Sequence, residues 1–132
     1  MSDRQNISSG TPWESVHGYS RAVRVGNNVY VSGTTASDEQ GNVMGENDPY
    51  AQTVYIIEKI SSALAEAGAT LADVVRTRVF VTDISRWEDV ARGHAKFFSE
   101  IRPASTMVEI TQLVDKRQIV EIEVDAVIGA AR

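Results

Sequence analysis

Hydrophobic and polar residues alternate along several short stretches of the chain, which is the pattern of β-strands that bury one face. The first stretches, residues 20–25 and 29–32, flank a turn at Gly26, Asn27 and Asn28, which predicts a β-hairpin. A further strand is predicted over residues 74–82, with an aliphatic face formed by Val75, Thr77, Val79 and Val81. Strands are also predicted over residues 105–110 and 120–128.

Two segments instead have apolar residues at the spacing of an amphipathic helix. The first opens at Pro49, after an Asp48 cap, and is expected to end at Ala67, before Gly68. Its predicted buried stripe is Val54, Ile57, Ile60, Ala63, Leu64 and Ala67. The second begins near Asp83 or Ser85. Its predicted apolar face contains Trp87, Val90, Ala91, Phe97 and Phe98, and His94 lies on the same stripe.

The predicted order is therefore β-β-α-β-α-β-β, an α+β fold in which one domain spans residues 1–132. Both helices are expected to cover one face of a mixed sheet. The other face carries Arg76, Arg78, Phe80, Glu121, Glu123 and Asp125. Such a face is either a solvated surface with cross-strand ion pairs or an interface between identical sheets that encloses charges in pockets between subunits.

Composition narrows the classes of function. With 42% hydrophobic and 23% charged residues in 132, the chain is typical of a globular domain. Its formal net charge of −5 opposes binding to a phosphate backbone, so no nucleic-acid partner is expected. There is no cysteine, and His17 and His94 lie far apart, so we expect no metal and no cofactor. No apolar run has the length of a membrane helix, so we expect no membrane partner and a cytoplasmic location.

Short segments spread in order across nearly the whole chain resemble the Rid (YjgF/YER057c/UK114) family. They are residues 18–20 (GYS), 29–33 (VYVSG), 79–83 (VFVTD), 97–98 (FF), 102–105 (RPAS) and 120–123 (VEIE). The resemblance implies a chorismate-mutase-like fold and a homotrimer in which the sheets form an inner barrel. It also implies ligand clefts at the subunit interfaces.

The best-known members of this family hydrolyse reactive enamines and imines to a 2-keto acid and ammonia, and the resemblance implies such a deaminase activity here. The reaction needs a cation for the substrate carboxylate, a group that handles protons, and a positioned water. Ser105 stands where the active members have a carboxylate-binding arginine, and Arg102 is the candidate replacement. The expected catalytic residues are Glu121 and Arg102, and the expected substrate-binding residues are Tyr19, Gly33, Ser105 and Thr106.

Other interpretations of these residues remain open. Glu121 is also suited to pair with Arg76 or Arg78, and Arg102 to be an exposed arginine at the end of a loop. At the level of function, the alternative to a hydrolase acting on C=N bonds is a non-enzymatic or differently specific protein that binds small carboxylates. A ribonuclease or translation-inhibitor activity, attributed to some family members, is the third alternative, because the net negative charge of the chain disfavours binding to the phosphates of RNA.

Overall fold

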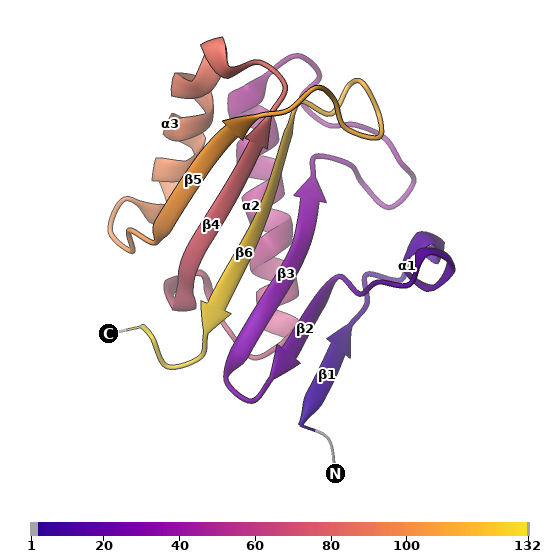
Figure 1. The fold of residues 1–132 in the computed structure, drawn as a ribbon, viewed down its shortest axis with the longest axis vertical. Helices are drawn as coiled ribbons and strands as arrows, with labels where there is room; N and C mark the ends of the chain where they lie inside the picture. The colour runs from indigo at the N-terminus through magenta and orange to yellow at the C-terminus, as the bar shows by residue number, and fades with distance from the viewer. Residues whose placement is uncertain (1–2, 132) are drawn as a thin grey trace.

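The computed structural model describes residues 3–131, which form a six-stranded β-sheet with the two long helices on one face (Figure 1). The strands are β1 (Arg4–Ile7), β2 (Ala22–Val25), β3 (Asn28–Thr35), β4 (Val74–Val81), β5 (Ala104–Glu109) and β6 (Val120–Val127). They lie in the order β1-β2-β3-β6-β4-β5. The β4–β5 pair is parallel and the other neighbouring pairs are antiparallel, so the sheet is mixed as predicted.

The helices are α1 (Pro12–His17), α2 (Pro49–Glu66) and α3 (Trp87–Phe98), with 3₁₀ turns η1 (Leu71–Asp73) and η2 (Ile84–Arg86). α2 and α3 lie behind the same face of the sheet in Figure 1, which confirms the predicted α+β architecture. β1 and α1 were not predicted. β1 buries only Ile7, and α1 has 6 residues, so neither produces a periodic pattern.

α2 begins as predicted, because the Asp48 side chain accepts a hydrogen bond from the Ala51 amide at 3.0 Å and Pro49 follows the cap. Its buried stripe is broader than expected. Val54, predicted to be buried, is only half-buried. The stripe continues instead through Gln52, Thr53 and Ile56, because α2 packs against both the sheet and α3.

Gly93 sets how closely α3 packs on α2. A Cβ at Gly93 would lie 2.9 Å from both Cβ and Cγ2 of Thr53, closer than such atoms pack. Val90 and Phe98 complete the buried face of α3. Trp87, expected on this apolar face, is exposed because it is the first residue of the helix, at the end that follows the η2 turn.

A β-bulge in β4 changes the sheet face on which the Val75 side chain lies from the face that was predicted. The register with β6 shifts between Val74 and Arg76, so Val74 is buried and Val75 is 40% exposed. Strict alternation places Val75 with Thr77 and Val79, and that prediction is wrong. Beyond the bulge the predicted alternation holds, and Thr77, Val79 and Val81 face the helices.

We expect Val79→Asp to lower the free energy of unfolding by several kcal/mol, because Val79 is 1% exposed and an unpaired buried charge is costly. Val75→Asp, on the same strand, is the matched control and is expected to change stability far less. Urea denaturation of both variants measures the difference. Equal losses for the two variants would contradict the bulged register.

Candidate functional site

The site is organised by a second β-bulge, near the end of β3. The register with β6 shifts between the Val31–Val124 pair and the Thr34–Ile122 pair, so Ser32 and Gly33 lie opposite one residue of β6. Glu121 of β6 lies against this bulge. A Cβ at Gly33 would come within 2.9 Å of Cδ and Oε2 of Glu121, so the carboxylate occupies the space that glycine leaves.

The carboxylate of Glu121 is half-buried on the sheet face that α2 and α3 leave uncovered. Burial raises the pKa of Glu121, Arg21 acts to lower it, and Glu123 acts to raise it. A carboxyl group whose pKa is raised can accept and return a proton more readily than an ordinary glutamate. Glu121 therefore has the environment of a group that handles protons.

Arg21 approaches the same bulge from the β2 side. Its Nη2 donates a hydrogen bond to the carbonyl oxygen of Gly33 at 2.7 Å. Burial lowers the pKa of Arg21, while the charges of Tyr19, Glu14 and Glu121 raise it. Within residues 3–131, Arg21 forms no ion pair, and its buried Nε has no hydrogen-bond partner.

Tyr19, two residues before Arg21, lines a broad open hollow of about 490 Å³. The walls of the hollow come from β1, α1, β2 and β3, and they include Glu14 and Ser32. Burial raises the pKa of Glu14, but hydrogen bonds from Ser9 and Thr11 outweigh it and hold that pKa below its ordinary value. Glu14 thus anchors α1, and Tyr19 is 43% exposed beside it.

Polar side chains from two other elements fix the end of β3 next to Glu121. Lys59 of α2 donates to the carbonyl oxygens of Thr35 and Ser37 at 2.9 and 2.6 Å, and burial lowers its pKa to about 8. Gln118 donates to the hydroxyl of Thr35 at 3.2 Å. Because Thr35 pairs with Glu121 across the strands, these contacts stiffen the backbone that presents the carboxylate.

The structure therefore places Gly33 against Glu121, and Tyr19 and Glu121 each near enough to Arg21 to interact with its charge. It does not bring Ser105, Thr106 and Arg102 to them within one chain. Ser105 and Thr106 lie on β5, and β4 lies between β5 and β6. Arg102 is exposed in the loop before β5, with a φ of 55°. That loop adjoins the start of β4, whereas Glu121 pairs with Phe80 near the other end of β4.

Ser105 faces the helices, away from Glu121. Its Oγ accepts a hydrogen bond from the buried Thr77 hydroxyl at 2.8 Å, and Thr77 Oγ1 lies 2.9 Å from Nε2 of His94. The single hydroxyl hydrogen of Thr77 goes to Ser105, so His94 is the donor to Thr77. Burial lowers the pKa of His94, in keeping with a neutral imidazole in this chain of hydrogen bonds.

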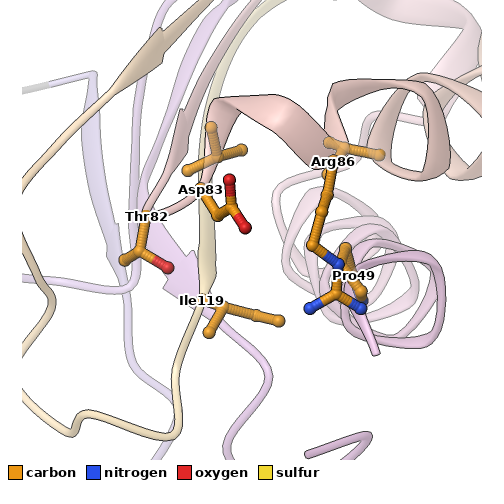
Figure 2. A pocket seen from close by; sticks show the side chains of 7 residues that line it. Pro49, Thr82, Asp83, Arg86 and Ile119 are labelled. Carbon is orange, nitrogen blue, oxygen red and sulfur yellow. The ribbon is translucent and has the colours of Figure 1, made fainter. Parts of the chain in front are cut away.

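A smaller hollow lies where the end of β4, η2 and the start of α2 meet (Figure 2). It holds about 20 Å³, the space of roughly one water molecule. Arg86 extends along it beside Pro49 in Figure 2. Its Nη1 and Nη2 donate hydrogen bonds to the side-chain and main-chain oxygens of Asn47. The hollow contains none of the expected site residues and cannot enclose an amino-acid-sized substrate.

Among residues 3–131 there is no group of three or more His, Cys, Asp or Glu side chains placed to hold a metal ion. None of the helices in that part of the chain combines the length and apolar character required to cross a bilayer.

A sequence model for a family described as Endoribonuclease L-PSP matches residues 10–128, which is nearly the whole chain. The chain belongs to the Rid (YjgF/YER057c/UK114) family. Among its Rid-family relatives, an uncharacterized protein of Streptomyces coelicolor, SCO2049, is 38% identical over 127 residues, covering 96% of this chain and 93% of its own. A RutC family protein of Pyrococcus abyssi is 34% identical and covers 80% and 82%.

Solved Rid structures have the same fold. Rv2704 of Mycobacterium tuberculosis, described as a member of the YjgF/YER057c/UK114 family, is 51% identical, with a TM-score of 0.86 and coverage of 95% of this chain and 99% of its own. The YjgF gene product of E. coli is 29% identical, with a TM-score of 0.80 and coverage of 93% and 98%. The resemblance found in the sequence is therefore confirmed at the level of family and fold.

Sequence reasoning missed Arg21 as a member of this Rid site. The signal was present, because Arg21 precedes the buried Ala22 and must point to the face opposite the helices. It also lies two residues after Tyr19, which the family resemblance had selected. Without the bulge at Gly33, nothing in the sequence connects Arg21 to Glu121.

We expect Gly33→Ala to fold but to displace the Glu121 carboxylate, because the new Cβ would occupy the position now within 2.9 Å of Oε2. The atoms that must move belong to a flexible side chain, so the loss of stability should be small. An NMR titration of the Glu121 carboxyl carbon would report the change. An unchanged chemical shift and pKa of Glu121 in Gly33→Ala would contradict the close contact.

Proposed function

We propose that this Rid-family protein is a hydrolase of reactive enamines and imines derived from amino acids. The observation that carries the proposal is the half-buried Glu121 carboxylate, with a raised pKa, held against Gly33 on an uncovered sheet face. Family membership supports the reaction class, since the best-known relatives are deaminases of this kind. No cofactor or metal is required for the chemistry.

In the proposed reaction, water adds to the carbon of a C=N bond and the nitrogen leaves as ammonia. Addition forms one carbon–oxygen bond and gives a carbinolamine; its remaining carbon–nitrogen bond then breaks as the hydroxyl loses its proton, so the C=N bond is replaced by the C=O bond of a 2-keto acid and both protons of the water leave on ammonia. Glu121 would orient the water and pass its two protons to the nitrogen, the first as the water adds and the second as ammonia departs. Tyr19 lines the nearby hollow, where its phenol can hydrogen-bond to the substrate.

Glu121→Gln is expected to lower turnover at least about tenfold, because it removes the proton-transfer group and keeps its shape. Binding of a 2-keto acid product should change much less. The assay generates imines with an amino-acid oxidase and follows their decay with semicarbazide across a panel of amino acids.

The pH profile supplies a second readout. Because burial raises the pKa of Glu121, the wild-type rate should fall with acid at a pH above the ordinary 4.5 of glutamate, as the carboxylate takes up a proton. That acid limb should be absent in Glu121→Gln. Saturable binding of 2-keto acids without acceleration of imine decay by wild type would instead favour a non-catalytic carboxylate-binding protein.

A homotrimer is the assembly that fits this proposal. The sheet face opposite the helices carries Phe80 beside charged residues, and Arg78 reaches Glu123 and Asp125 at 3.5 and 3.2 Å on it. Ser105 and Arg102 lie far from Glu121 in one chain, so the expected site residues can meet only across an interface.

Light scattering is expected to give three times the 14.4 kDa of one chain. A monomeric mass at micromolar concentration would contradict the trimer. Ribonuclease activity, suggested by the name of the matching family model, is not proposed for this chain because its net charge of −5 opposes phosphate binding.

A further inference from the structure

We propose that Arg21 binds the carboxylate of the ligand in this site and thereby selects substrates that carry a carboxylate next to the C=N bond. The choice of substrate rests on the proposed function, whereas the carboxylate-binding role of Arg21 can be tested without it. The inference places the cation immediately before β2, where Arg21 bonds to Gly33 of the bulge and lies near enough to Glu121 to interact with its charge. It requires neither Ser105 nor Arg102.

The hydrogen bonds of Arg21 leave donors for a ligand. A guanidinium has five N–H groups in a planar fork. Arg21 uses Nη2 for the Gly33 carbonyl, and its buried Nε has no acceptor among residues 3–131. A buried donor without a partner is costly, and a carboxylate can accept two parallel hydrogen bonds from such a fork. The bond to Gly33 at the same time holds the fork in place.

The charges around Arg21 also favour an anionic ligand. Arg21 is half-buried and has no ion-pair partner in the described chain, although Glu121 is near enough to interact with it. Half-buried cations are stabilised by an anion in contact. A ligand carboxylate at Arg21 would supply that anion and leave Glu121 free to act on water.

The other arginines near the site are less suitable. Arg24, in β2 three residues after Arg21, points to the helix side and donates to the carbonyl oxygens of Gly26 and Ala67. Arg78 is engaged by Glu123 and Asp125. Arg102 is exposed at the opposite end of β4, so only a neighbouring subunit could present it here.

The test compares two small ligands that differ only in charge: 2-oxobutanoate and its neutral amide, 2-oxobutanamide. Calorimetric titration of the wild type should show that the carboxylate binds at least about tenfold more tightly than the amide, as a charge-assisted pair would produce. Arg21→Gln should remove this preference, because it should weaken the binding of 2-oxobutanoate and leave that of 2-oxobutanamide unchanged. Arg21→Lys should keep part of it, because the charge remains but the planar fork is lost.

Arg24→Gln is the matched control, since it removes an arginine three residues further along the chain on the other face and should keep the wild-type preference. The carboxylate-to-amide ratio is insensitive to a general loss of folding, which would weaken both ligands alike. The inference is overturned if wild type shows no preference, if Arg21→Gln keeps it, or if Arg102→Gln abolishes it instead. Carboxylate binding that depends on Arg21, without imine hydrolysis, would refute the hydrolase while supporting Arg21.

Discussion

The close approach of Glu121 to Gly33 is the constraint on which the site depends. It exists because β3 carries an extra residue opposite β6, which turns the backbone of Gly33 toward the carboxylate. Any side chain at this position would push Glu121 away. The carbonyl of the same glycine accepts a hydrogen bond from Arg21, so one bulge positions both the Glu121 carboxylate and a permanently charged guanidinium. Lys59 and Gln118 then fix the strand end that follows.

The sheet separates its two kinds of polar group by face. On the helix side, Thr77 is fully buried and its hydroxyl is hydrogen-bonded to Ser105 and His94. The polar groups on that side are therefore paired with one another within the fold. On the other side, charges are only half-buried and partly unpaired, as for Arg21. Groups that are unpaired and half-accessible keep the capacity to bind a ligand, which is why the candidate chemistry gathers on the face without helices.

Much of the fold could be predicted from the sequence, because the alternation of β4 and β6 and the helical spacing of α2 directly reflect burial. The bulges could not. Val75 has the right spacing and the right chemistry for the core, yet one extra residue turns it outward. In the site, Tyr19, Gly33 and Glu121 were found through family resemblance, whereas Arg21 depends on the bulge at Gly33, a backbone irregularity that residue patterns do not encode.

The position of the cation has a consequence for how the site is divided between subunits. Ser105 extends from β5 toward the helices, on the opposite sheet face from Glu121, so an arginine in its place would not approach Glu121 of the same chain. Arg21 lies on the same face as Glu121 and shares its glycine. If Arg21 binds the ligand carboxylate as proposed, one chain supplies both this cation and the proposed proton-transfer group, Glu121, and the sheet fixes the two relative to each other.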